Sequence, residues 1–446
     1  MRQWLHWLAM HAVVRRFAAM GVRRGDVQAR MMADPAVRAD PVAFYDELRD
    51  LTAGGNPLIR CRVSYVTIDH EVANELLRSE DFRVIKLGAN LPGPLRRLEE
   101  RTRPKALHPL RPPSLLAVEP PEHTRYRKTV SSVFTPRAVA ALREQVHDTA
   151  EALLDEMAGA DDTDVVDVVE RYCSQLPVTV ISEVLGVPER ERARVLEFGE
   201  AAAPSLDFGL SWPQYRSVDR GLESFNEWLS GHLAELRRNP GDDLMSQLIR
   251  TAEGTPESGP LLDDRELRGV AGLVLAAGFE TTVNLLGNGI RMLMDAPDQL
   301  ALLREDPQLW PNAVEEILRL DSPVQLSARV ALRDVDVAGT RVLRDEMVAI
   351  YLAAANRDPA IFPDPHRFDV TRANAGRHLA FSGGRHFCLG AALARAEGEV
   401  GLRAFFDRFP QARPAGSGRR RDTRVLRGWS NLPVTLGPEV SAARQV

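Results

Sequence analysis

A long helical stretch near the middle of the chain constrains the fold most. Asp263 or Asp264 can cap its start, since Glu266 follows Asp263 at the spacing of a capping box, and Pro297 ends it. The stretch holds about 32 residues, which make a helix ~48 Å long. From residue 122 to about residue 320 the patterns are helical almost throughout. We therefore predict a mainly helical protein.

The composition of this helix decides between a bilayer and a protein interior. Gly269 to Phe279 carries no charge and little polarity, but this run is too short to span a membrane. Glu280 then stands in mid-helix, followed by Thr281 and Thr282. Because an acid lies at the centre of the helix, we predict no transmembrane segment.

Strand patterns are confined to short segments. Ile59 to Asp69 and Gln325 to Val348 both alternate in the manner of short strands. The range 82–122 is irregular and rich in proline, and loops of that length are usually functional or mobile. A last helix is predicted from about Leu389 to Phe409. We expect a single domain over residues 1–446, mainly α with a small β-rich lobe.

Charge and cysteine usage bound the function classes. The net charge of −5 gives no sign of a general nucleic-acid-binding surface, so we expect no nucleic-acid partner. The three cysteines, Cys61, Cys173 and Cys388, are too widely spaced for a disulfide framework, and they show no zinc-site spacing. This usage favours a reducing compartment, so we expect a cytoplasmic protein.

The first 30 residues allow two interpretations. Gln3 to Val14 is too short to span a bilayer, and Arg15 and Arg16 follow it where a signal peptide would place its cleavage site. One helix face can carry four of its side chains, Trp4, Leu5, Leu8 and Ala12. We expect a helix packed on the body as a peripheral extension of the domain. A helix that lies on a membrane surface is the alternative.

The strongest local signal surrounds Cys388, in Phe381-Ser-Gly-Gly384-Arg-His386-Phe-Cys388-Leu-Gly390. A cysteine that opens a helix is stabilised as the thiolate by the helix dipole and by free backbone N–H groups. A haem iron ligand needs that anion, because thiolate donation favours O–O cleavage. Gly384 and Gly390 permit the backbone to approach a flat macrocycle, and Phe381 can keep water from the sulfur. A buried structural cysteine on a glycine turn is the plainer interpretation.

This loop resembles the haem-binding loop of cytochromes P450, whose pattern is Phe-x-x-Gly-x-His/Arg-x-Cys-x-Gly. Every fixed position matches, although Ser382 stands where glycine is common. The resemblance implies the cytochrome P450 fold, haem b as the cofactor, and Cys388 as the ligand to its iron. It also implies that His386 contacts a haem propionate. The likeness extends from about residue 40 to residue 437.

Further propionate ligands are implied upstream, in Pro120-Pro-Glu-His123-Thr-Arg-Tyr-Arg127. His123 and Arg127 are four residues apart and share a helix face, where they can bind a carboxylate. The segment resembles the family's Pro-Pro-Glu-His-Thr-Arg-x-Arg, whose histidine and last arginine bind propionates. Arg329 matches another propionate-binding position. Without the resemblance, a solvated basic helix face would be the default.

A structural network is implied by Glu316-Ile-Leu-Arg319. Residues three apart on a helix can pair, but a lone pair of this kind is weak evidence. The family carries Glu-x-x-Arg at this place, where it forms a buried network with an arginine of the later meander. Arg367 matches that third member.

Oxygen activation is implied for Ala277-Gly278-Phe-Glu280-Thr281-Thr282 on the long helix. Ala277 and Gly278 are small enough to leave room for a diatomic ligand. The Thr281 hydroxyl can hand on protons, and Glu280 can relay them from solvent. The stretch matches the family's Ala/Gly-Gly-x-Asp/Glu-Thr, with Phe279 as a departure that puts the pocket shape in doubt. A polar helix patch with an ordinary buried threonine is the alternative.

The resemblance implies a monooxygenase that inserts one oxygen atom of O2 into an apolar organic molecule, by hydroxylation or epoxidation. No reductase domain is recognisable, so a separate ferredoxin and ferredoxin reductase are the expected electron donors. Arg125, Lys128, Arg395 and Arg403 are a candidate basic docking patch for the ferredoxin. Two alternatives stay open: a peroxygenase of the same fold, and a haem-binding sensor or scaffold without turnover.

Overall fold

The predicted central helix is α14, Asp264–Asp295, in the computed structural model. Asp263 accepts the backbone N–H of Glu266, and the Glu266 side chain accepts the N–H of Asp263, so the predicted capping box is confirmed. Among the residues that the structure describes, α14 is the one helix long and apolar enough to cross a membrane. However, 67% of its most apolar window is buried inside the protein. The apolar face of α14 is therefore occupied by its own chain.

The structure describes residues 1–446 except 90, 92, 132–135, 159–164, 255–258 and 438–446. The other α-helices are α1 (Arg2–Trp7), α2 (Val13–Val22), α3 (Val27–Ala33), α4 (Pro35–Ala39), α5 (Val42–Thr52), α6 (His70–Arg78), α7 (Gly93–Thr102), α8 (Glu122–Ser131), α9 (Pro136–Ala158), α10 (Gln175–Val184), α11 (Arg192–Ala202), α12 (Trp212–Arg238), α13 (Leu244–Glu253), α15 (Pro297–Glu305), α16 (Trp310–Leu320), α17 (Leu352–Ala355) and α18 (Ala391–Arg408). Short π or 3-10 turns are η1 (Leu8–Ala12), η2 (Val169–Cys173), η3 (Glu189–Glu191), η4 (Ala203–Leu206), η5 (Pro307–Leu309), η6 (Ala375–Arg377) and η7 (Gly384–His386).

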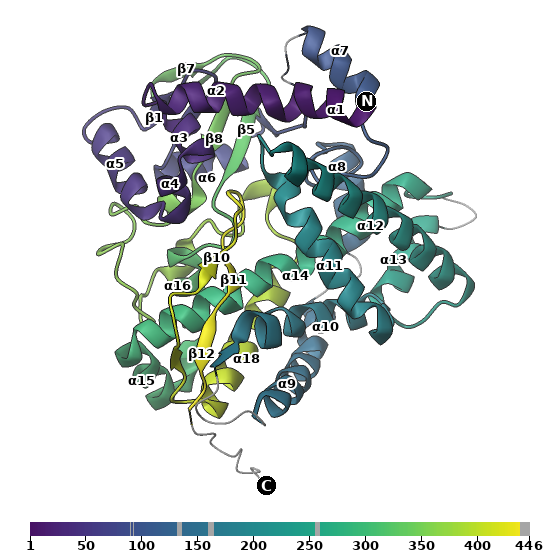
Figure 1. The fold of residues 1–446 in the computed structure, drawn as a ribbon, viewed down its shortest axis with the longest axis vertical. Coiled ribbons are helices and arrows are strands. Elements are labelled where there is room, and N and C mark those ends of the chain that lie inside the picture. Colours follow the sequence, from purple (N-terminus) through teal and green to yellow (C-terminus); the bar gives the residue numbers. More distant parts are fainter. Residues whose placement is uncertain (90, 92, 132–135, 159–164, 255–258, 438–446) are drawn as a thin grey trace.

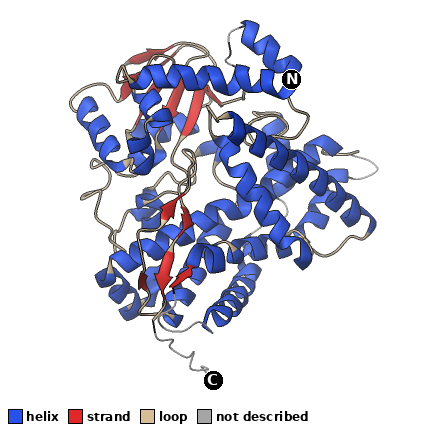
Figure 2. Ribbon diagram, viewed as in Figure 1, coloured by secondary structure: helices blue, strands red, loops and turns tan. Residues whose placement is uncertain are grey.

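The strands are few and short. They are β1 (Leu58–Arg60), β2 (Tyr65–Thr67), β3 (Phe82–Val84), β4 (Val165–Asp167), β5 (Ser327–Ala331), β6 (Val335–Val337), β7 (Thr340–Val342), β8 (Met347–Ile350), β9 (Arg413–Pro414), β10 (Arg419–Arg420), β11 (Trp429–Asn431) and β12 (Pro433–Thr435). Figure 2 shows them gathered in two places, a lobe at the upper left and a strip below it, while helices make up the rest. The predicted mainly helical fold with a small β-rich lobe is confirmed.

The largest sheet joins strands that precede the main helical region to strands that follow it. Its order is β1-β2-β8-β5-β3, with β2 and β8 parallel and the other pairs antiparallel. In this sheet Val84 of β3 lies opposite Arg329 of β5. The register therefore brings the segment after β3 next to Arg329, although about 245 residues separate them in sequence.

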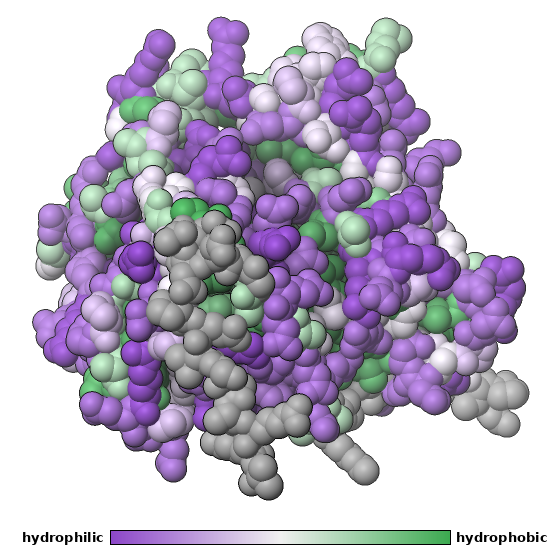
Figure 3. Space-filling view, turned by 60° about the horizontal axis from the view of Figure 1, so that its bottom comes forward, coloured by the Kyte–Doolittle hydropathy of each residue, from purple (hydrophilic) through white to green (hydrophobic). Residues whose placement is uncertain are grey.

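The helical core is built around α14 (Figure 1), which packs against α10, α18, α12, α11 and α16. Buried apolar side chains from these helices form one continuous cluster. On the face drawn in Figure 3 the surface is mostly hydrophilic, and hydrophobic residues show mainly in its recesses. The helix that follows the Cys388 loop, α18, thus lies directly against the central helix.

Two segments differ from or refine the sequence expectation. The range 82–122, expected to be irregular, contains β3 and the ten-residue helix α7. The N-terminal residues form α1, η1 and α2, which pack on the body and bury His6, Ala9, Met10 and His11. The expected packed helix is therefore present, and it is longer than the apolar run that predicted it.

Candidate functional site

The Cys388 loop is held by its own backbone. The Cys388 N–H donates to the Phe381 carbonyl at 3.0 Å, and the Phe387 N–H donates to the Gly384 carbonyl at 3.1 Å. Helix α18 begins at Ala391 with Gly390 as its N-cap, so Cys388 stands just before the helix start. The predicted helix at this place is confirmed, with its first turn two residues later than expected.

The thiol of Cys388 differs from those of Cys61 and Cys173. All three cysteines are described and free, and Cys388 alone is exposed. Desolvation by the surrounding protein raises the pKa of the Cys388 thiol, and the Gly390 N–H, Arg127 and Arg395 oppose that rise. The Arg127 guanidinium approaches from α8 and donates to the Phe387 carbonyl at 2.7 Å. A cation and a backbone donor thus lie beside a thiol that is open to a ligand.

The glycine at position 384 is required by both conformation and space. Gly384 has φ +63°, and a Cβ there would lie 2.7 Å from the Leu77 carbonyl oxygen. Ser382, which stands where the family commonly has glycine, also has a positive φ of +62°. The left-handed conformation explains the preference for glycine at that position, and Ser382 adopts it at some cost in strain.

Phe381 is buried in the loop, and a charged side chain covers its ring. The guanidinium of Arg395, on α18, stacks over the Phe381 ring at 4.5 Å from its centroid. Arg395 also forms a bidentate pair with Glu315 at 2.5 and 3.0 Å, and His378 lies 3.2 Å from the same carboxylate. Phe381 is thus fixed beside the thiol by a network that reaches into α16.

The predicted propionate ligands His123 and His386 meet in space. Their ring centroids are 4.4 Å apart, and His123 is buried while His386 is half-buried. Burial and the neighbouring His386 lower the pKa of His123 to about 4, so its ring is neutral at pH 7. The His123 Nε2 atom is buried and has no hydrogen-bond partner among the described residues.

Arg329 presents a second unpartnered donor. Its Nη1 atom donates to the Ser327 hydroxyl and to the Ala328 carbonyl, both at 3.0 Å. Its Nη2 atom is buried and has no partner among the described residues. Burial lowers the pKa of Arg329 to about 10, so it stays cationic at pH 7. Buried donors of this kind are rare unless a ligand completes them, so this site fits an anionic group such as a haem propionate.

Glu119 is a member of this cluster that sequence reasoning missed. It accepts the Val84 N–H at 2.6 Å, lies 3.3 Å from Arg385 and lies 3.5 Å from the Nε2 atom of His386. Burial acts to raise the pKa of Glu119, but His386 and the Val84 N–H outweigh it and lower the pKa to about 2. The sequence signal that could have pointed to Glu119 is its position directly before the Pro-Pro-Glu-His motif. The carboxylate orients His386 beside His123.

The stretch of α14 that the sequence linked to oxygen activation includes a strip of less buried residues in the middle of the helix. Ala277 is exposed and Thr281 is half-buried, and Leu273 and Val274 continue the strip one turn earlier. The Thr281 hydroxyl donates to the Ala277 carbonyl at 3.2 Å. Residues at spacings of three, four and eight share a helix face. The strip is therefore the part of α14 that is left open to a ligand.

Gly278 and Phe279 lie off this strip, and each contacts a neighbouring helix. A Cβ at Gly278 would lie 2.9 Å from Cδ1 of Ile181 on α10, so the absence of a side chain at Gly278 admits a neighbouring helix. Phe279 is 1% exposed and fills the space left by Gly199 of α11. Of the two small residues, only Ala277 borders the open strip, and Phe279 does not shape it.

Glu280 is buried and pairs with a residue that the sequence did not indicate. The Arg421 Nη1 atom lies 2.8 Å from Glu280 Oε1, with both side chains largely out of solvent. Burial raises the pKa of Glu280, and Arg421 opposes that rise. Arg421 follows β10 and stands 141 residues after Glu280, so no local pattern links the two.

The Glu316–Arg319 pair lies fully buried on α16, with Arg319 donating to both carboxylate oxygens at 2.7 and 2.8 Å. The third arginine is Arg372, whose Nε atom donates to Glu316 Oε1 at 3.0 Å. We expected the side chain of Arg367 in this place. Arg367 is exposed and contributes only its carbonyl, which accepts from Arg319 at 3.2 Å and from Arg372 at 3.0 Å. The expectation for Arg367 was therefore wrong, because the meander turns that side chain outward.

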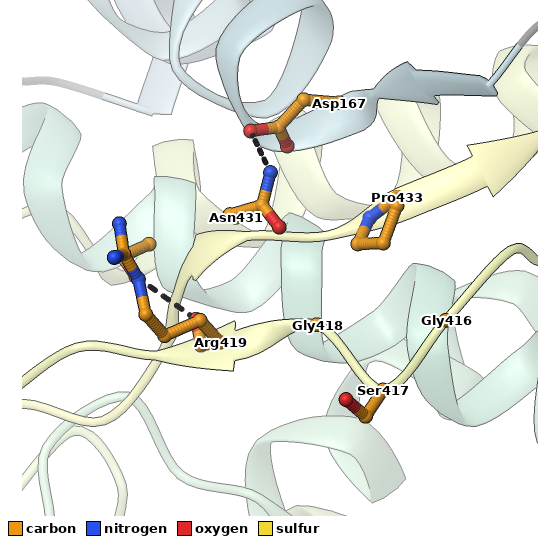
Figure 4. Close-up of a pocket in the computed structure, with 8 residues that line it drawn as sticks. Asp167, Gly416, Ser417, Gly418, Arg419, Asn431 and Pro433 are labelled. Carbon is orange, nitrogen blue, oxygen red and sulfur yellow. Dashed lines mark hydrogen bonds between the residues drawn. The ribbon is translucent and has the colours of Figure 1, made fainter.

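Two hollows elsewhere lack this chemistry. One of about 540 Å³ lies beside the β10–β11 hairpin (Figure 4), where Asn431 already donates to Asp167 at 2.7 Å. The other, of about 170 Å³, is lined by Tyr45, Gln325 and several paired arginines. Within the described residues, no group of three or more His, Cys, Asp or Glu side chains is placed to hold a metal ion. The Cys388 region remains the candidate site.

Comparison with known proteins agrees with this choice. The family model described as "Cytochrome P450" matches residues 207–426. A Mycobacterium tuberculosis protein named "Putative cytochrome P450 140" is 69% identical over 438 residues, which are 98% of each chain. The 6-deoxyerythronolide B hydroxylase of Saccharopolyspora erythraea is 45% identical over 71% of this chain and 76% of its own. The ligand-free structure of CYP164A2 from Mycobacterium smegmatis superposes with a TM-score of 0.79 at 32% identity, covering 92% of this chain and 99% of that one.

Proposed function

Because this chain belongs to the cytochrome P450 family of haem-containing oxidoreductases, we propose that it is a haem-thiolate monooxygenase that hydroxylates or epoxidises an apolar organic molecule, in which Cys388 would bind the haem iron. The observation that carries the proposal is the pairing of an open thiol with unsatisfied donors. Cys388 is the exposed cysteine, and His123 Nε2 and Arg329 Nη2 are buried with no hydrogen-bond partner in the part of the chain that the structure describes. A flat dianionic cofactor bound through a thiolate satisfies both features.

The residues that would hold the haem divide into two groups. Cys388 would bind the iron, while Phe381 shields the sulfur and Gly384 and Gly390 keep the loop close to the ring. The propionates would accept from His123, His386, Arg127 and Arg329. Bound haem would supply the activation of O2. Two observations support this placement of the haem: the unpartnered atoms of His123 and Arg329, and the match of the sequence motifs.

Proton supply is assigned to α14. Thr281 Oγ1 lies on the open strip and would pass protons into the pocket. Glu280 would then supply Thr281 with a new proton from solvent. Successive residues point about 100° apart around a helix, and the Glu280 carboxyl is held by Arg421. The carboxyl must therefore leave Arg421, or act through water, before its proton reaches Thr281.

An apolar substrate is supported by the lining of the strip. Leu273, Val274 and Ala277 offer no charge, which suits a ligand with few polar anchors. Relatives bear names that fit such a class, among them 6-deoxyerythronolide B hydroxylase and vitamin D(3) 25-hydroxylase. We propose a large, mostly apolar substrate for this chain as well.

A separate ferredoxin and its reductase are the proposed electron donors, in the cytoplasm. The basic patch expected for docking is largely neutralised within the chain. Arg125 pairs with Glu266, Arg395 with Glu315, and Arg403 with Asp407. Docking therefore depends less on these arginines than the sequence suggested, and Lys128 is the member for which the described residues show no ion pair.

The test is the spectrum of the reduced protein with carbon monoxide. Thiolate ligation predicts the red-shifted Soret band of the parent and its loss in Cys388→His, because imidazole donates less charge than thiolate. Cys61→Ser is the matched control and should keep the band. A Cys388→His protein that retains haem and an unchanged band would refute the ligand assignment. Substrate-dependent NADPH consumption with a surrogate redox chain separates a monooxygenase from a haem-binding sensor.

A further inference from the structure

The N-terminal helices carry a surface that the proposed chemistry does not use. Within residues 1–25 there are five arginines and no aspartate or glutamate. The whole chain has a net charge of −5, so the remainder is more acidic still. The first acidic residue, Asp26, is occupied by the backbone N–H groups of Ala29 and Arg62. Positive charge is thus concentrated at this end of the molecule.

One side of these helices is fixed to the body. The Trp7 Nε1 atom donates to the Leu210 carbonyl at 2.9 Å, and the Leu210 N–H donates to His11 Nδ1 at 3.2 Å. His6 lies 3.3 Å from the Thr102 hydroxyl and 3.0 Å from the Arg111 guanidinium. Figure 1 shows α1 and α2 in line along one edge of the molecule, with α7 beside α1. The opposite side of the helices therefore has a fixed orientation toward solvent.

The outward side of α2 combines apolar and basic residues. Phe17 is 53% exposed and Met20 is 37% exposed, and Trp4 of α1 adds an indole that is 47% exposed. Arg16, Arg23 and Arg24 are also exposed, and none of them pairs with an acidic side chain among the described residues. At 100° per residue, positions 16, 17 and 20 of α2 fall within a sector of about 100°, and Arg23 and Arg24 follow directly after the helix ends at Val22. We call these five residues the α2 face.

From this arrangement we propose that the α2 face docks on the surface of an anionic phospholipid bilayer. A helix that lies in the membrane interface combines exposed apolar side chains with arginines, and the α2 face holds both kinds of residue. Each arginine near an anionic bilayer contributes about 1 kcal/mol to binding. A second copy of the chain is disfavoured, because two α2 faces would bring six exposed arginines together. The helices lie on the surface and do not span it.

Docking in this way would set the orientation of the whole enzyme. The α2 face is connected through Trp7 and His11 to Leu210, in the loop before α12. The acidic remainder of the molecule would be repelled from the same bilayer, so the chain would stand with this end toward the lipid. This inference concerns the N-terminal helices and does not depend on the haem chemistry.

The experiment is co-sedimentation of the haem-loaded full chain with sucrose-loaded vesicles. The probes are phosphatidylcholine vesicles with 30% phosphatidylglycerol and vesicles of phosphatidylcholine alone. We expect binding to the anionic vesicles that weakens with added salt. The variant Arg16→Gln/Arg23→Gln/Arg24→Gln should lower the partition coefficient about 100-fold, since each charge contributes about fivefold. Phe17→Ser should lower it by about tenfold without any change in charge.

The matched control removes three exposed arginines elsewhere. Arg190→Gln/Arg265→Gln/Arg413→Gln has the same net charge as the triple variant on the α2 face and should bind as the parent does. All variants should keep the haem absorption spectrum and the unfolding midpoint of the parent. Equal losses in the two triple variants would overturn the proposal, as would equal binding to neutral and anionic vesicles. Capture by polyglutamate without vesicle binding would replace the bilayer by an acidic protein, and a dimer that Phe17→Ser dissociates would replace it by a second copy.

Discussion

At the residue scale, the buried network behind the Cys388 loop depends on Arg372. Glu316, Arg319 and Arg372 are all buried, so removal of one cation leaves a carboxylate with unmatched charge in the interior. We expect Arg372→Gln to lower the free energy of unfolding by about 3–5 kcal/mol. Arg367→Gln should change it by no more than about 0.5 kcal/mol, because that side chain is exposed and only its carbonyl takes part. Urea unfolding of both variants would decide, and equal losses would restore Arg367 to the network.

The oxygen chemistry should depend most on the hydroxyl group of Thr281. We expect Thr281→Ala to keep normal haem content, a normal carbon monoxide spectrum and near-normal substrate binding. Its consumption of NADPH should continue while product per NADPH falls and hydrogen peroxide rises, because proton delivery into the pocket fails. Thr281→Ser should recover most of the coupling. Wild-type coupling in Thr281→Ala, measured with a confirmed substrate, would return Thr281 to a packed helix threonine.

The candidate site could be predicted where residues are neighbours in sequence and not where contacts are distant. Cys388, His386 and His123 sit in local motifs whose spacing is set by one turn or one helix. Arg421, Glu119 and Arg372 act through partners that lie 141, 267 and 56 residues away. In the sequence, an arginine on a surface loop cannot be distinguished from an arginine that pairs with a buried carboxylate. Only the packing of the meander and of the β10 segment distinguishes them.

At the element scale, the approach of α10 to α14 separates the roles of two small residues. Gly278 faces Ile181, whereas Ala277 is part of the open strip. Gly278→Ala should keep carbon monoxide binding and coupling, because the added methyl group meets only the movable end of Ile181. Ala277→Val should weaken carbon monoxide binding, because its larger side chain fills the strip. Flash-photolysis rebinding rates test both variants, and a larger effect from Gly278→Ala would mean that Gly278 borders the ligand after all.

The contact between α14 and α18 contains a carboxylic acid that should tie stability to pH. Glu397 is 1% exposed, and burial raises its pKa to about 8 against a smaller opposing effect of the Thr282 side chain. Between pH 4.5 and 8 the unfolded chain releases this proton and the folded chain keeps it, so stability falls as pH rises. The loss approaches about 3 kcal/mol at pH 7.

Glu397→Gln should therefore stabilise the protein at pH 8 and have little effect near pH 4.5. Unfolding midpoints measured across this range would show a flatter pH dependence in the variant than in the parent. Glu305→Gln is the control, since Glu305 is exposed and the change in charge is the same. An unchanged pH slope in Glu397→Gln would mean that the carboxyl ionises freely in the folded state.

At the scale of the whole molecule, the sequence predicted α14 well because its capping box and its apolar run are both local. It did not predict α7, since Pro92, Pro94 and Pro104 around that helix are typical of irregular chain. Nor could it pair β3 with β5, because a strand of three residues carries no register of its own. The architecture was accessible through motif order, and the assembly of its distant segments required the structure.

The assembly of distant segments is clearest in the loop of residues 207–210, which both ends of the chain hold. Asp207 is buried and accepts the N–H groups of Arg424 and Val425, each at 3.0 Å. Arg424 in turn donates to the Phe208 carbonyl at 2.6 Å and to the Met32 carbonyl. From the N-terminal side, contacts come from Trp7, His11 and Arg15. The position of this loop before α12 is thus set jointly by segments that begin and end the sequence.

We expect Asp207→Ala to release this loop before it unfolds the protein. The change leaves two backbone N–H groups without their acceptor and removes the carboxylate that lies 3.7 Å from Nε of the partly buried Arg424, which should cost about 2–4 kcal/mol. Because the N-terminal contacts remain, the loss should be local: amide exchange in residues 207–211 should accelerate at least about tenfold, while α14 and α18 keep their protection. Asp242→Ala, at an exposed acid, is the control and should change neither. Uniform acceleration across the molecule would show instead that Asp207 supports the global fold, and unchanged exchange in the loop would show that the N-terminal helices hold it alone.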